Sequence, residues 1–236
     1  MTEFIDRILN NSTMVFYLLL VIALLLTRIP IAGKYFRCLN TMLHEAGHAF
    51  ITLLVSGEVI AVNLFADTSG TTVTKAKNRF LQILIAAAGY PSSAITGFIF
   101  LFLLSKGHYV VILFILASIT LLLMVLSIRN GYGLFWAGTF SLINLLLIYF
   151  NSQQWIYMGA AFFSLIILTD SVLSVVTLFV LSIKTPNKAG DATNLQKFTS
   201  IPAVIWSLLF LAFSGLVAYL AITRYFPPLS GIIPNT

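Results

Sequence analysis

Charged side chains are scarce in this sequence, and their scarcity indicates the solvent in which the chain folds. Of the 236 residues, only 8% are Asp, Glu, Lys or Arg, whereas 59% are hydrophobic. The mean hydropathy is +1.01. A soluble domain carries roughly a quarter charged residues, so this composition excludes an ordinary water-soluble protein. It predicts an integral, multi-pass membrane protein whose surroundings are the lipid bilayer.

Cysteine and dense basic runs are also scarce. The single Cys38 excludes an internal disulfide and a zinc cluster built on cysteines. The net charge is +6, from 13 Lys and Arg against 7 Asp and Glu, but no basic run is dense enough for a nucleic-acid surface. Basic residues at helix ends face lipid headgroups instead, so no nucleic-acid partner is expected.

Long apolar runs fill most of the chain. A membrane-spanning helix needs about 20 mostly apolar residues. By this criterion, six apolar spans are expected near 12–32, 80–104, 109–128, 132–150, 154–183 and 201–224. The segment 39–56 is a seventh, more polar helix. The run at 154–183 is long enough to tilt, or to break near Asp170. The sequence therefore predicts an all-α bundle of about six to seven transmembrane helices, a single polytopic domain over 1–236 with a frayed tail at 226–236.

Residues 57–79 have a different character, because β-prone residues flank the turn-forming segment 67–70. This pattern resembles a short β-hairpin that follows the polar helix; an ordinary interfacial loop is the alternative. Non-helical backbone at membrane depth must be buried in protein or lie at the interface. A hairpin here could cover the polar helix or offer an edge to an extended peptide.

The polar helix carries His44-Glu45-Ala46-Gly47-His48, an HExxH pattern. Residues four apart share one face of a helix, so the two imidazoles can bind one ion, and zinc suits such ligands. Glu45 lies one step round the helix, where it can take a proton from the metal-bound water. The chain has only three histidines, and two lie in this motif. Gly47 indicates close approach of another helix or of substrate backbone.

A catalytic zinc ion usually has a third protein ligand. The candidates are His108, Asp170 and Asp191. His108 follows Lys106-Gly107 in a turn and fits a solvated loop residue better. Burial in an apolar segment favours Asp170, whereas a position near the mouth of a helix favours Asp191. The spacing of the residues does not decide between these two carboxylates.

At this point the chain resembles the site-2 protease family of intramembrane zinc metallopeptidases, in particular its compact bacterial branch. HEAGH in an apolar helix, Ala87-Ala88-Gly89-Tyr90, Ser127-Ile128-Arg129-Asn130 and Gly190-Asp191-Ala192 carry the likeness over about residues 40–210. The resemblance implies that His44, His48 and Asp191 hold Zn²⁺, that Glu45 is the general base, and that Asp170 has a supporting role. The segment 57–79 is too short for an inserted PDZ domain, which needs about 50 residues or more.

There are departures from the family pattern. The aspartate stands in Gly190-Asp191-Ala192 rather than in an Asn-Pro-Asp-Gly setting, and the segment 88–93 lacks the Asn of a Gly-Pro-x-x-Asn element. The resemblance implies an intramembrane zinc metalloprotease of a bacterial cell membrane, which hydrolyses peptide bonds in or next to transmembrane segments. Its partner would be a membrane protein or peptide substrate. The alternative is a transporter or channel for protons or divalent cations that uses the buried His, Glu and Asp groups.

Overall fold

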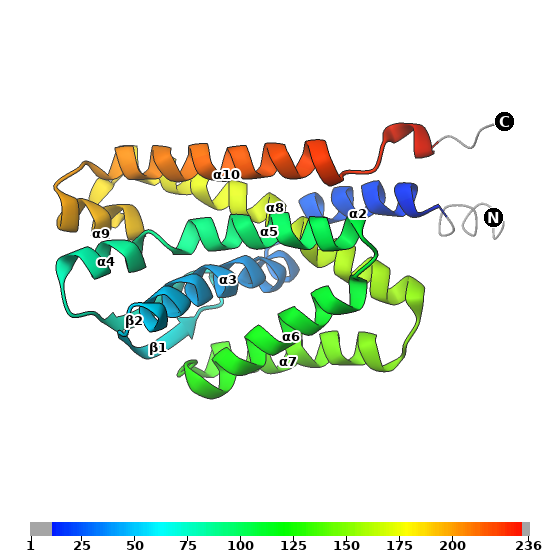
Figure 1. The fold of residues 1–236 in the computed structure, drawn as a ribbon, viewed down its shortest axis with the longest axis horizontal. Coiled ribbons are helices and arrows are strands. Elements are labelled where there is room, and N and C mark those ends of the chain that lie inside the picture. Colours follow the sequence, from blue (N-terminus) through cyan, green and yellow to red (C-terminus); the bar gives the residue numbers. More distant parts are fainter. Residues whose placement is uncertain (1–10, 233–236) are drawn as a thin grey trace.

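The computed structural model describes residues 11–232, which form a bundle of helices beside one small sheet (Figure 1). In chain order the elements are α2 (Ser12–Leu26), α3 (Ala32–Leu54), β1 (Glu58–Leu64), β2 (Gly70–Lys75), α4 (Arg79–Ala86), α5 (Gly89–Ser105), α6 (Tyr109–Leu126), α7 (Gly131–Tyr149), α8 (Gln153–Lys184), the 3₁₀ turn η1 (Pro186–Lys188), α9 (Gly190–Thr199), α10 (Ala203–Tyr225) and the 3₁₀ turn η2 (Leu229–Ile232). The sheet, α4 and α9 gather at one end of the bundle (Figure 1).

Four of the described helices, α6, α7, α8 and α10, are long and apolar enough to cross a membrane. Helices α4 and α5 make a fifth candidate if they count as one span, bent by 42°. Helix α2 has only 15 residues, fewer than the roughly 20 that a span needs. The mostly helical fold is confirmed, whereas the predicted count of six to seven spans is not.

The first two expected helices have different bounds from those predicted. Helix α2 ends at Leu26 rather than near 32, and a turn that contains Pro30 follows it. Proline lacks a backbone N–H and cannot continue a helix. Helix α3 begins at Ala32, well before the predicted start at residue 39. Its early turns include Arg37, whose Nε lies 3.0 Å from Asp170 Oδ1 on α8.

Helix α8 is continuous over 32 residues and does not break at Asp170. Asp170 is only 3% exposed. A carboxylate buried in this way needs a partner, and Arg37 of α3 provides it. The ion pair therefore ties the HExxH helix to the longest helix of the bundle.

The predicted hairpin within 57–79 is confirmed as a two-stranded antiparallel sheet. Asn63 pairs with Thr71 and Val62 with Thr72, and a β-bulge lies between Val59 and Ala61. The outer edge of β1 is covered by the segment 127–130, since the Val62 N–H donates to the Ser127 carbonyl at 2.8 Å. Successive residues of a strand point their backbone groups to alternate sides. The backbone groups of Gly70 and Thr72 therefore face the edge of β2 that lies away from β1.

The C-terminal segment turns back onto the start of the bundle. The Tyr17 hydroxyl of α2 donates to the Pro227 carbonyl at 2.7 Å, and η2 packs against α2. Residues 233–236 of the expected frayed tail lie outside the described residues. A second, smaller apolar core seats α9 against α8 and α10, and includes Val175, Leu178, Leu195 and Phe210.

Candidate metal centre and active site

His44 and His48 lie one helical turn apart on α3, as the spacing predicts. Their Nε2 atoms are 3.1 Å apart, and the ring centroids are 4.7 Å apart in an edge-to-face arrangement. The Tyr90 ring packs against the His44 ring in an edge-to-face arrangement, with centroids 4.5 Å apart. This packing fixes the plane of the His44 imidazole.

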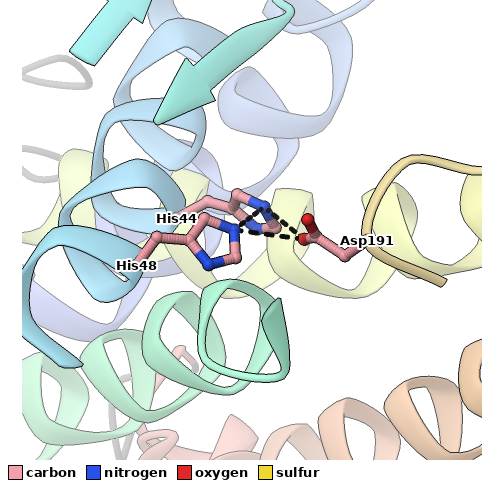
Figure 2. Close-up of side chains that lie close together, drawn as sticks. All are labelled: His44, His48 and Asp191. Carbon is pink, nitrogen blue, oxygen red and sulfur yellow. Dashed lines mark hydrogen bonds and ion pairs between the residues drawn. The ribbon is translucent and has the colours of Figure 1, made fainter. Parts of the chain in front are cut away.

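Asp191 completes the cluster from the first turn of α9. Its Oδ2 lies 3.0 Å from His44 Nε2 and 3.2 Å from His48 Nε2 (Figure 2). Burial by itself would raise the pKa of the Asp191 carboxyl, but the adjacent His48 and His44 outweigh burial and hold that pKa below its usual range. Within residues 11–232, these three side chains are the one group of His, Cys, Asp or Glu that could hold a metal ion, with ligand atoms all within 4.8 Å.

Local hydrogen bonds hold α9 in the orientation that directs Asp191 into the cluster. The Thr193 hydroxyl donates to the Pro186 carbonyl at 2.5 Å and accepts from the Ala189 N–H at 2.9 Å. At the other end of α9, Arg79 of α4 donates to the carbonyls of Phe198 and Lys197. These contacts join α9 to α4 and to the turn η1 that follows α8.

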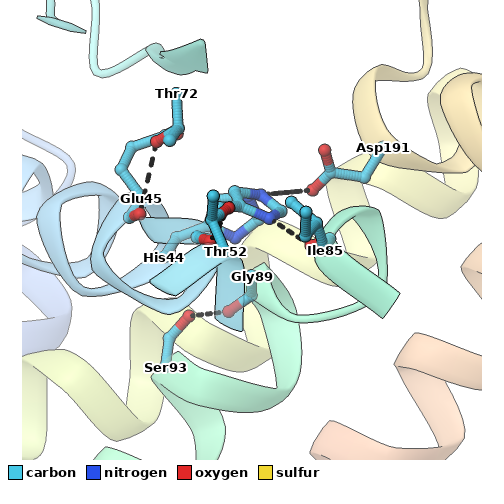
Figure 3. Close-up of polar contacts among 9 residues, drawn as sticks. His44, Glu45, Thr52, Thr72, Ile85, Gly89, Ser93 and Asp191 are labelled. Atoms are coloured by element: carbon cyan, nitrogen blue, oxygen red, sulfur yellow. Dashed lines mark hydrogen bonds and ion pairs between the residues drawn. The ribbon is translucent and has the colours of Figure 1, made fainter. Parts of the chain in front are cut away.

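The second nitrogen of His48 has its own partner. Nδ1 lies 2.7 Å from the Ile85 carbonyl of α4. A carbonyl oxygen can only accept, so Nδ1 carries a proton, which leaves Nε2 as the nitrogen that could bind a metal. The Thr52 hydroxyl donates to the His48 carbonyl at 2.7 Å and supports the same helical turn (Figure 3).

Two glycines let α5 approach the histidine face of α3. A Cβ on Gly89 would lie 2.5 Å from His44 Nε2 and 2.6 Å from His48 Nε2. A Cβ on Gly47 would lie 2.5 Å from the Ser92 Cβ, so the approach of another helix that Gly47 indicated is present. Any larger residue at these positions would push the two helices apart.

Glu45 is 4% exposed and does not belong to the three-residue cluster. Its Oε2 accepts a hydrogen bond from the Thr72 hydroxyl of β2 at 2.6 Å (Figure 3). Glu45, the three cluster residues and the β2 residues Gly70, Thr72 and Thr74 line one cleft of about 650 Å³. The cleft is therefore bounded by the candidate metal ligands on one side and by a strand on another.

The other two sequence candidates lie elsewhere. His108 is exposed and precedes the first residue of α6. Asp170 pairs with Arg37 and is absent from the cluster. Thr72, Tyr90 and the Ile85 carbonyl were not predicted as parts of the site. Two sequence signals lie near them: the predicted hairpin at 57–79, which contains Thr72, and Ala87-Ala88-Gly89-Tyr90, which contributed only to the resemblance.

Together, the fold and the site define a helical protein with apolar helices long enough for a membrane and a possible metal centre at one end. A family model described as Peptidase M50B-like matches residues 17–221. The chain therefore belongs to the Peptidase M50B-like family, which is the membrane-embedded site-2 protease family, and the predicted resemblance is confirmed. The segment between α3 and α4 holds only the two strands, with no room for a PDZ domain. No curated protein and no solved structure gives a significant match.

Proposed function

We propose that this protein is an intramembrane zinc metallopeptidase located in a bacterial cell membrane. Residues 1–236 would form a single polytopic domain. The membership of the peptidase family supports the reaction class. It also favours a peptidase over a transporter or channel. The substrate would be a membrane protein or peptide, cut in or next to a transmembrane segment.

The observation that carries the proposal is the geometry of His44, His48 and Asp191. Zinc bound at about 2.0–2.1 Å in tetrahedral geometry puts its ligand atoms about 3.3 Å apart. The three ligand-atom separations in the cluster are 3.0, 3.1 and 3.2 Å. Two neutral imidazole nitrogens and one carboxylate oxygen form a donor set that zinc prefers. The residues present therefore fit a zinc ion.

When bound, zinc would polarise the scissile carbonyl and acidify the attacking water. Glu45 is the general base in this proposal: it takes a proton from the water and then passes it to the leaving amine. Its burial beside the cleft keeps the carboxylate out of bulk solvent. Proton transfer by a well-placed carboxylate contributes about 10²- to 10⁴-fold to the rate.

The substrate is proposed to bind as an extended strand along the free edge of β2. Gly70, Thr72 and Thr74 of this strand line the cleft, and an extended peptide can add to such an edge through main-chain hydrogen bonds. A transmembrane helix must unwind locally before its peptide bond can be reached in this way. The proposal therefore favours substrates with helix-breaking residues near the cut.

The test is cleavage of a transmembrane model substrate by purified wild type and by Glu45→Gln. We expect the variant to keep its zinc, since Glu45 is outside the cluster, and to lose at least about a hundredfold in rate. If Glu45→Gln cleaves the substrate at the wild-type rate, the proposed mechanism is wrong. If the wild type binds zinc but cleaves no membrane substrate, the assignment as a peptidase is wrong.

A further inference from the structure

We infer that Thr72 is a positioning residue, which holds the Glu45 carboxylate in the orientation that the general base needs. The inference rests on the proposed function and adds to it a role for the hairpin. The hairpin would then serve two purposes: the edge of β2 binds the substrate, and the Thr72 side chain of the same strand orients the general base Glu45.

The contact between Thr72 and Glu45 is short and joins a hydroxyl to a carboxyl group. The Thr72 hydroxyl lies 2.6 Å from Glu45 Oε2 and 3.2 Å from the Glu45 carbonyl (Figure 3). A hydroxyl that donates to an ionised carboxylate makes a stronger bond than one between neutral groups. Within the described part of the chain, no other side chain donates a hydrogen bond to this carboxylate.

Two further contacts hold the hairpin against the same part of α3. A Cβ on Gly70 would lie 2.5 Å from Glu45 Oε1 and 2.8 Å from Glu45 Cγ, so the β2 backbone lies directly against the carboxylate. The Thr41 hydroxyl, one helical turn before Glu45, donates to the Thr68 carbonyl in the hairpin loop at 2.8 Å. The Glu45 side chain is therefore enclosed by β2.

These contacts limit the orientations that the Glu45 carboxylate can take. With Oε2 held by Thr72, the carboxylate cannot rotate about its last bond without breaking the contact. Misplacement of a reacting group by about 1 Å can cost a hundredfold in rate. Loss of the Thr72 hydroxyl would therefore slow the chemical step and leave metal binding intact, since Thr72 does not contact His44, His48 or Asp191.

The first test compares kcat, KM and zinc content in three variants. Thr72→Val keeps the shape and removes the hydroxyl; Thr72→Ser restores it. Val73→Thr is the matched control, because it makes the reverse change at the next residue of β2, whose side chain is 45% exposed and does not line the cleft. We expect kcat to fall about tenfold in Thr72→Val, with KM and zinc content unchanged. Thr72→Ser should recover most of the rate.

A second measurement requires neither activity nor metal. Amide hydrogen exchange of the β2 segment is followed in metal-free wild type, Thr72→Val, Glu45→Ala and the double variant. Each single change should speed exchange about tenfold, and the effect in the double variant should fall well short of the product of the two single effects, because both changes remove the contact between the Thr72 hydroxyl and Glu45 Oε2. If the two effects multiply, the contact does not exist.

The two experiments separate the two claims. An unchanged kcat in Thr72→Val, or an equal loss in Val73→Thr, overturns the positioning role while Glu45→Gln still tests the peptidase. Absence of cleavage in the wild type overturns the peptidase, whereas the exchange cycle still decides whether Thr72 holds Glu45.

Discussion

Asp191 Oδ2 lies 3.2 Å from His48 Nε2, although 143 positions separate the two residues in the chain. The contact joins the first turn of α9 to the middle of α3. A ligand set divided between such distant segments exists only in the folded bundle. A metal ion that binds it would therefore bind the native state in preference to the unfolded one.

Zinc should accordingly stabilise the protein against unfolding. A free zinc concentration 100 times Kd should add about 2.7 kcal/mol, seen as a rise in Tm in detergent. His48→Ala should abolish the rise, because it removes a proposed ligand. Glu45→Gln should keep it. An equal rise in wild type and His48→Ala would show that zinc acts somewhere else.

Gly89 should tolerate no side chain. The methyl group of Gly89→Ala would lie 2.5 Å from His44 Nε2, so the helices must separate or the imidazole must move. We expect zinc affinity to fall more than tenfold, measured by competition with a chelator. Gly215→Ala is the control, since a Cβ there meets nothing within 4 Å. Equal affinities in the two variants would contradict the close approach of α5.

The ion pair between Arg37 and Asp170 should contribute to the stability of the fold. Removal of one partner leaves a buried charge without compensation and costs about 3–5 kcal/mol. We expect the lower end of this range for Arg37→Met, because the Arg37 side chain is 31% exposed. The double variant Arg37→Met/Asp170→Leu should be more stable than Arg37→Met in thermal unfolding. A double variant that is less stable would mean that the two residues do not act as a pair.

The free edge of β2 should decide substrate affinity. Thr74→Pro removes a backbone N–H from a strand that lines the cleft. Thr74→Val keeps the N–H and serves as the control. We expect Thr74→Pro to raise KM several-fold with unchanged zinc content, since one main-chain hydrogen bond to the substrate contributes about 1 kcal/mol. If both variants keep the wild-type KM, the substrate does not bind along this edge.

The parts of the site that depend on local spacing could be predicted from the sequence. His44 and His48 share a helix face because they are four residues apart, and the hairpin follows from β-prone residues around a turn. The approach of another helix at Gly47 also followed, since a glycine inside a helix has no local reason to be there.

The tertiary parts could not be predicted in the same way. Asp170 and Asp191 both stand beside apolar residues, and only the path of the chain after α8 shows which one reaches the histidines. The choice of Asp191 came from the resemblance. Thr72 and Gly89 were not identified as parts of the site because a threonine in a strand and a glycine beside a turn are ordinary local choices.

The helix bounds were uncertain for a related reason. The predicted bounds left residues 33–38 between two helices, but Arg37 finds its partner on α8 and helix α3 continues through this segment. The expected span at 12–32 is shorter because Pro30 lies in a turn after α2. In both cases hydropathy reports only the composition of a segment. The residue at which a helix begins or ends depends on turn geometry and on the partners of charged side chains.

The central claim, a zinc site formed by His44, His48 and Asp191, is tested most directly by the zinc content of purified wild type, Asp191→Ala and Asp170→Ala. We predict about one zinc per chain in the wild type and in Asp170→Ala, and almost none in Asp191→Ala. Loss of zinc in Asp170→Ala with retention in Asp191→Ala would contradict the account, as would a wild type that binds no zinc.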